Sequence, residues 1–136
     1  MSNLRRRRAF PLGLSAIALA SFALPALAQT PPCTQVTDGT AEIAIDRDAA
    51  ADPDCLEIPK RKVDVVWTAT GDVTQLLVTW KLVDAKKPLD DPDCSGTTCT
   101  FEKLKAKKDG EYQYAITVTR ADGSTVTVDP KLIIKN

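Results

Sequence analysis

The chain has 136 residues, with 18 basic and 18 acidic side chains and no histidine. Without an imidazole, Ser-His-Asp and Cys-His catalysis are excluded, as are histidine-bearing zinc sites and His/Met copper sites. No phosphate-cradling glycine loop occurs among the six glycines, and the sequence predicts no cofactor.

The first 28 residues have the pattern of a cleavable signal peptide. Four arginines (residues 5–8) precede an apolar run of about 13 residues, which is too short to span a bilayer as a helix. Pro25 ends this run, and the Ala-Leu-Ala of residues 26–28 is typical of a signal-peptidase site. An uncleaved membrane anchor is the alternative. The pattern favours cleavage after Ala28, with no stable membrane insertion afterwards.

The export route predicts where the protein works. Residues 7–12 resemble the twin-arginine signal, but that route carries folded proteins, so a chain that forms disulfides after export favours the general secretory route. The alanine-rich style is that of Gram-negative signals, which predicts a periplasmic or secreted protein. Removing residues 1–28 leaves 108 residues, enough for a single domain.

Charge bears on the partners of that domain. The signal peptide holds four of the 18 basic residues and no acidic one, so 14 basic and 18 acidic side chains remain, a net charge of −4. This sign disfavours binding to nucleic acid or to an anionic membrane, and leaves a protein or another macromolecule as the expected partner.

Short runs with β-branched residues and a period of two predict strands along the rest of the chain. In chain order they lie at residues 41–45, near Leu56 and ending before Pro59, then at 62–70, 74–83, 99–105, 111–120, 124–128 and 132–134. Turns or loops separate them at residues 46–53, Gly71-Asp72, 84–98, Asp109-Gly110 and Asp122-Gly123. No convincing helix occurs. About seven or eight strands with such spacing predict an all-β, antiparallel β-sandwich.

Two details of this pattern carry further expectations. Residues 62–70 and 74–83 each have one apolar face, so we expect them to form an antiparallel pair around Gly71-Asp72. Lys103, Lys105 and Lys107 would line one face of the strand predicted at residues 99–105. Lysines of this kind protect an edge strand against aggregation; an anion-binding stripe is the less favoured interpretation.

The four cysteines, Cys33, Cys55, Cys94 and Cys99, all follow the predicted signal peptide. An even number of cysteines in an oxidising compartment predicts two disulfides. Four cysteines allow three connectivities, and closeness in sequence favours Cys33–Cys55 and Cys94–Cys99. A metal site is disfavoured because no histidine is present to complete a mixed set of ligands.

One segment resembles the E–F corner of immunoglobulin-like domains. It begins with Phe-Glu-Lys-Leu at residues 101–104 and continues with Asp-Gly-Glu-Tyr-Gln-Tyr at residues 109–114. The resemblance implies that Tyr112 bonds back to the chain upstream, and that Trp80 or Trp67 packs between the sheets. It covers about half of the mature chain and departs at Tyr114, which stands where antibody domains place their second bridging cysteine. It implies an immunoglobulin-like fold and no particular function.

The disulfide-closed loop is the candidate binding surface, because a loop ordered in advance loses less entropy on binding. Its residues are Asp90, Asp91, Asp93, Ser95, Gly96, Thr97 and Thr98. The sequence favours a non-catalytic interaction domain. The alternatives are an inhibitor that presents this loop to an exported hydrolase, a calcium module and a carboxylate-based enzyme. The last two depend on the aspartates at positions 46, 48, 52, 54, 90, 91 and 93, whose spacing is not that of an EF-hand.

Overall fold

The computed structural model describes residue 13 and residues 32–136. Apart from Gly13, the predicted signal peptide lies outside the described residues. Within the described part, no helix is long and apolar enough to cross a membrane.

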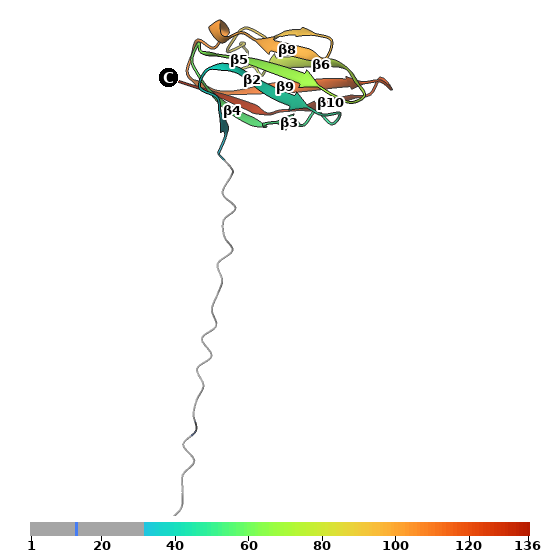
Figure 1. Cartoon of the computed structure of the whole chain (residues 1–136), viewed down its shortest axis with the longest axis horizontal. Coiled ribbons are helices and arrows are strands. Elements are labelled where there is room, and N and C mark those ends of the chain that lie inside the picture. Colours follow the sequence, from blue (N-terminus) through green and yellow to red (C-terminus); the bar gives the residue numbers. More distant parts are fainter. Residues whose placement is uncertain (1–12, 14–31) are drawn as a thin grey trace, which may run out of the picture. The chain divides into compact units, whose positions relative to one another are not determined.

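Residues 32–136 are built from strands, with one turn of 3-10 helix (Figure 1). The strands are β1 (Thr34–Gln35), β2 (Gly39–Ile45), β3 (Ala51–Asp52), β4 (Cys55–Pro59), β5 (Val63–Ala69), β6 (Val73–Trp80), β7 (Asp93–Ser95), β8 (Thr98–Phe101), β9 (Gly110–Arg120), β10 (Thr125–Val128) and β11 (Lys131–Lys135). The 3-10 helix is η1 (Lys103–Lys105). The predicted all-β class is confirmed for this part of the chain.

The strands form two sheets with the apolar core between them. One sheet has the order β1-β4-β11-β9-β10, with β6 on the other edge of β9. The second has the order β3-β2-β5-β8-β7. The 11-residue strand β9 is the centre of the first sheet: its first half pairs with β11, its second half with β10, and β6 runs along its opposite edge.

The expectation of antiparallel sheets is wrong, because both sheets are mixed. β2 runs parallel to β5, and β4 runs parallel to both β1 and β11. The chain passes from one sheet to the other between β1 and β2 and again between β3 and β4. A strand that joins a sheet after such a crossing is not bound to the antiparallel direction that a tight hairpin imposes.

The predicted pairing of residues 62–70 with residues 74–83 is also wrong. β5 pairs with β2 and β8, whereas β6 lies in the other sheet beside β9. Trp67 of β5 and Trp80 of β6 both face the core, from opposite sheets. A period of two shows that each strand has one buried face. It does not show whether two such faces lie side by side or opposite each other.

The strand predicted at residues 99–105 is shorter than expected. β8 ends at Phe101, and the next residues turn into η1, where the Asp64 carboxylate accepts a hydrogen bond from the Lys103 N–H at 2.6 Å. Lys103, Lys105 and Lys107 therefore do not line the face of a strand. The predicted loop at residues 84–98 in turn contains β7, which pairs with β8.

An aromatic cluster joins the two sheets at the centre of the core. The Trp67 indole N–H of β5 donates a hydrogen bond to the Tyr114 hydroxyl of β9 at 3.2 Å, and the two rings meet edge to face at 5.5 Å. The Trp80 ring packs edge to face on Phe101, Tyr112 and Tyr114. Burial raises the pKa of Tyr114 to about 12, so this hydroxyl stays neutral.

Candidate interaction surface

The disulfide-closed turn is fixed to the body of the domain. Cys94 of β7 and Cys99 of β8 lie directly opposite each other and are bonded, as Cys33 and Cys55 are. In the turn between these strands, the Gly96 carbonyl accepts a hydrogen bond from the Leu76 N–H, and the Thr97 carbonyl accepts one from the Ala69 N–H, both at 2.8 Å. This turn therefore joins the edge of β6 to the end of β5 and closes one side of the sandwich.

The candidate aspartates before this turn are each paired with a lysine. Lys105 contacts Asp93 at 3.1 Å, Lys107 contacts Asp90 at 3.7 Å, and Lys87 is hydrogen-bonded to Asp91. Their negative charge is thus balanced locally. No group of three or more metal-ligating side chains comes together among residues 32–136, so the described residues give the calcium interpretation no support.

The other aspartate group, at residues 46–54, shapes a loop. One carboxylate oxygen of Asp46 accepts hydrogen bonds from the N–H groups of Asp48 and Ala50, at 2.8 and 2.9 Å. Asp48 in turn contacts the Arg120 guanidinium at 2.8 Å. An aspartate that accepts hydrogen bonds from the backbone two and four residues further on is acting as a turn residue. The carboxylates of Asp46 and Asp48 are therefore accounted for by the structure of the loop.

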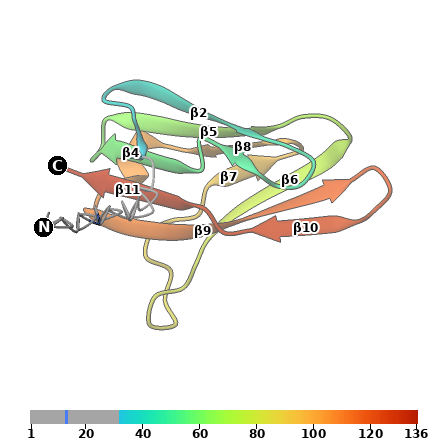
Figure 2. The same ribbon diagram turned by 90° about the horizontal axis from the view of Figure 1, so that it is seen from below.

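One projecting part of the chain lies before the candidate residues (Figure 2). Residues 82–87, which we name the tip hairpin, extend away from the sheets (Figure 2). Val83 and Lys86 exchange two backbone hydrogen bonds, at 2.9 and 3.0 Å, across a two-residue turn. Leu82 and Val83 expose 60% and 59% of their surface. The tip hairpin is thus a short ordered structure that presents two apolar side chains to solvent.

The turn of the tip hairpin is strained. Its two central residues, Asp84 and Ala85, have φ angles of 50° and 59°, in the left-handed region that favours glycine. This conformation fits a two-residue β-hairpin, for which Asp is suitable at the first position and Gly is the usual second residue. Ala85 occupies that second position at a cost of about 1 kcal/mol or more.

The base of the projecting loop is held firmly. Leu89 is buried in the core, and the Trp80 indole N–H donates a hydrogen bond to the Asp90 carbonyl at 2.8 Å. The Lys105 ammonium donates another to the Asp91 carbonyl at 3.1 Å. Because these contacts order residues 89–91, the tip hairpin is presented in a fixed direction.

Two hollows adjoin the tip hairpin and meet at Pro88. The first has a volume of about 260 Å³ and lies between the hairpin and β9, with Leu82, Val83 and Tyr112 in its wall. The second has a volume of about 440 Å³ and is lined by charged residues, among them Asp90 and Lys108. The exposed apolar side chains, Pro88 and these hollows form one irregular surface, which we name the tip surface. The sequence pattern did not single out Leu82 and Val83, because both lie inside the strand predicted at residues 74–83.

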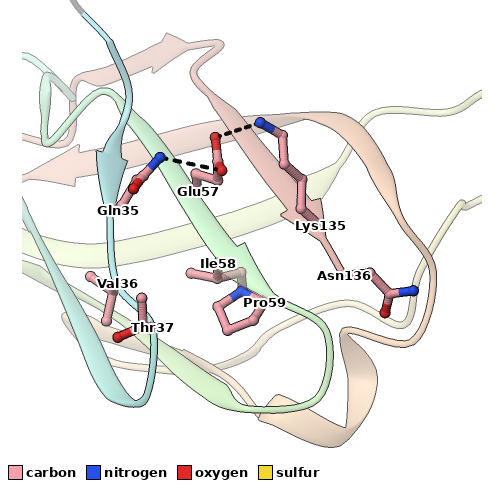
Figure 3. A pocket seen from close by; sticks show the side chains of 8 residues that line it. All are labelled: Gln35, Val36, Thr37, Glu57, Ile58, Pro59, Lys135 and Asn136. Atoms are coloured by element: carbon pink, nitrogen blue, oxygen red, sulfur yellow. Dashed lines mark hydrogen bonds and ion pairs between the residues drawn. The ribbon is translucent and has the colours of Figure 1, made fainter.

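A third hollow lies among β1, β4 and β11 (Figure 3). Its volume is about 120 Å³, below the roughly 300 Å³ at which small-molecule pockets begin. Its polar groups bind one another: Glu57 accepts hydrogen bonds from Gln35 at 3.4 Å and from Lys135 at 3.0 Å (Figure 3). This arrangement joins the three strands through Glu57.

The shifted pKa values have local causes. Burial and the nearby Asp109 carboxylate raise the pKa of Tyr112, whose hydroxyl donates a hydrogen bond to the Lys108 carbonyl at 2.8 Å. Hydrogen bonds from Ser124 lower the pKa of Asp122 in the β9–β10 turn.

Comparison with protein-family models and with curated protein sequences returns no match.

Proposed function

We propose that this protein is a non-catalytic, exported binding domain that recognises another protein through its tip surface. One observation carries the proposal: Leu82 and Val83 are exposed on a hairpin whose base is anchored in the core through Leu89 and Trp80. Exposed apolar side chains on an ordered projection are typical of protein-binding surfaces. A loop that is already ordered loses little further entropy when it binds.

The chemistry of the tip surface favours a partner with an apolar groove. Full burial of a leucine or valine side chain is worth about 1.5–3 kcal/mol, so Leu82 and Val83 can together supply a large part of a micromolar affinity. Lys86 and the charged hollow around Lys108 would lie at the polar rim of such an interface. The net charge of −4 left by signal cleavage disfavours nucleic acid as the partner.

We propose an immunoglobulin-like sandwich as the scaffold. Three features support it: the Tyr112 hydroxyl bonds back to the Lys108 carbonyl, the buried Trp80 packs on β9 residues, and one sheet places β6 beside β9. Tyr114, which the sequence resemblance places at the second bridging cysteine of antibody domains, joins the two sheets through its hydrogen bond with Trp67. The two disulfides that are present support an oxidising compartment, the periplasm or the exterior.

The test is a photo-crosslinking experiment with a binding measurement. A photoreactive residue at position 83 should capture a specific protein from the organism's exported fraction, and one at position 77 should not. Leu77 is the matched control, because its side chain is 46% exposed on the outer face of β6. The captured protein is then purified and its affinity measured for Leu82→Ser/Val83→Ser and for Leu77→Ser.

We expect the double substitution at the tip to weaken binding at least about tenfold, and Leu77→Ser to leave it within about twofold. Equal affinity of the wild type, Leu82→Ser/Val83→Ser and Leu77→Ser for the captured protein would refute the proposal. If only Ser95→Ala/Thr98→Ala weakened binding to the captured protein, the interface would instead lie at the disulfide-closed turn.

A second candidate function is inhibition of an exported hydrolase, which a projecting, ordered hairpin also favours. Its discriminating test is a panel of secreted proteases at micromolar concentrations of the protein. Inhibition that disappears with Leu82→Ser/Val83→Ser would support this class, and cleavage of the hairpin without inhibition would remove it.

A further inference from the structure

One edge of the larger sheet is covered along only half of its length. β10 and β11 follow each other along the same edge of β9 in an unbroken register, from Thr125 opposite Thr119 to Ile134 opposite Gly110. On their outer side, β4 pairs with β11 from Lys131 onward. β10 has no strand partner on that outer side among residues 32–136.

The hydrogen-bond pattern shows which backbone groups are left open. The Arg120 N–H donates to the Ser124 carbonyl, and the Tyr114 N–H donates to the Pro130 carbonyl. Because bonded and non-bonded pairs alternate in an antiparallel ladder, Val126 and Val128 bond to β9. The N–H and C=O groups of Thr125 and Thr127 therefore point outward. They point to the same side as the N–H of Lys131, which donates to the Asp54 carbonyl.

The four residues of β10 include none of the charges or prolines that commonly guard an edge strand. Edge strands are commonly guarded by a charge, a proline or a short length. β1 and β3 have two residues each, β7 lies against β6, and β2 carries the exposed Glu42. β10 is Thr-Val-Thr-Val, without charge or proline, and Val126 and Val128 are only partly buried against the core.

We propose that a second copy of this chain pairs with β10 and completes this edge. In an antiparallel pair centred on Val126, Thr125 of each copy lies opposite Thr127 of the other. Each pair exchanges both of its outward backbone hydrogen bonds. The two Val126 side chains meet on the partly buried face, and the added strand lies end to end with β4. The arrangement has the two-fold symmetry of a closed dimer.

Thr127→Pro tests this pairing directly. Proline removes the outward N–H of residue 127 but no ladder bond to β9, so the monomer fold should survive. Thr127→Val is the matched control, because it keeps the N–H. Sedimentation of the oxidised protein from about 5 to about 500 μM should show a mass that rises toward the dimer for the wild type and Thr127→Val, and a monomer for Thr127→Pro.

Two further measurements keep the test decisive. If Thr127→Pro does not fold, Thr125→Lys/Thr127→Lys replaces it, since it places like charges opposite each other in the dimer. In the wild type, amide exchange at residues 125 and 127 should slow at least about tenfold as concentration rises. A monomer at every concentration, or a dimer that survives both variants, would overturn the proposal. The Leu82→Ser/Val83→Ser protein should still dimerise. The outcome of the dimer experiment is therefore independent of the outcome of the binding experiment on the tip surface.

Discussion

The Trp67 indole and the Tyr114 hydroxyl satisfy each other in the middle of the core. Both side chains are almost fully buried, and the hydrogen bond between them at 3.2 Å joins β5 to β9. A buried donor without a partner costs more than an average hydrogen bond contributes, so the two residues depend on each other. Their rings also meet edge to face, which adds a directional aromatic contact.

Tyr114→Phe removes the acceptor and leaves the Trp67 N–H buried and unpaired. We expect the free energy of unfolding to fall by about 1–3 kcal/mol, measured by urea denaturation. Tyr112→Phe is the control, because the Tyr112 hydroxyl also takes part in a hydrogen bond, as donor to the Lys108 carbonyl, but lies nearer the surface. Tyr112→Phe should lower the free energy of unfolding by less than Tyr114→Phe does. An unchanged midpoint for Tyr114→Phe would show that the indole finds another partner.

The same hydroxyl makes stability depend on alkaline pH. Burial raises the pKa of Tyr114 from 10.0 to about 12, so the folded protein holds this proton more tightly than the unfolded chain does. The stabilisation is complete below pH 10 and is lost as pH rises from about 10 through about 12, by at most about 3 kcal/mol. Denaturation curves across this window should show the decline. In Tyr114→Phe the decline should be shallower, with only the part due to Tyr112 remaining.

Among the elements, the tip hairpin combines local strain with a firm base. Ala85 adopts a left-handed conformation that a side chain disfavours, while Leu89 and the Trp80–Asp90 hydrogen bond hold the following residues. Strain that persists because the surroundings impose it is common at binding sites. The element is therefore suited to presenting side chains in one conformation.

Ala85→Gly should relieve this strain. An Asp-Gly turn is the preferred sequence for this hairpin type, so we expect a gain of about 0.5–1 kcal/mol in unfolding free energy. Ala121→Gly is the matched control, because Ala121 is an exposed turn residue that is not among those with positive φ. That change should reduce stability by about 0.5 kcal/mol through the greater freedom of the unfolded chain. Thermal denaturation of both variants measures the difference. A loss of stability in both variants would show that Ala85 is not strained.

At the scale of the whole molecule, the two disulfides act at different places. Cys33–Cys55 ties the start of β1 to β4 across 22 residues, whereas Cys94–Cys99 closes a five-residue separation between β7 and β8. A cross-link stabilises mainly by restricting the unfolded chain, and the effect grows with the length of the closed loop. The longer bridge should therefore contribute more to the stability of the domain.

Removing each bridge separately tests that order. We expect Cys33→Ala/Cys55→Ala to reduce the free energy of unfolding by about 3 kcal/mol and Cys94→Ala/Cys99→Ala by about 2 kcal/mol. Guanidinium denaturation of the two double variants gives both values. A larger loss for the short bridge would show that it does more than close a loop, since its turn also bonds to Leu76 and Ala69.

Much of the fold followed from local patterns. Seven of the predicted strands correspond to β2, β4, β5, β6, β9, β10 and β11, because a period of two marks a strand with one buried face. The site was less predictable. The cysteines and aspartates of the candidate loop were found by residue type. Leu82 matched the apolar pattern of β6, and Val83 was the last residue of the strand predicted there.

The all-β class, the turns and the lack of imidazole chemistry could be predicted from the sequence, because they depend on residue types and on neighbours a few positions apart. Only contacts between distant segments show that β5 and β6 lie in opposite sheets, that three strand pairs are parallel, and that the apolar pattern continues past Trp80 into solvent. The physical reason is that strand pairing and burial are settled between segments distant in the chain. Side-chain alternation along one strand is the same whichever partner covers it.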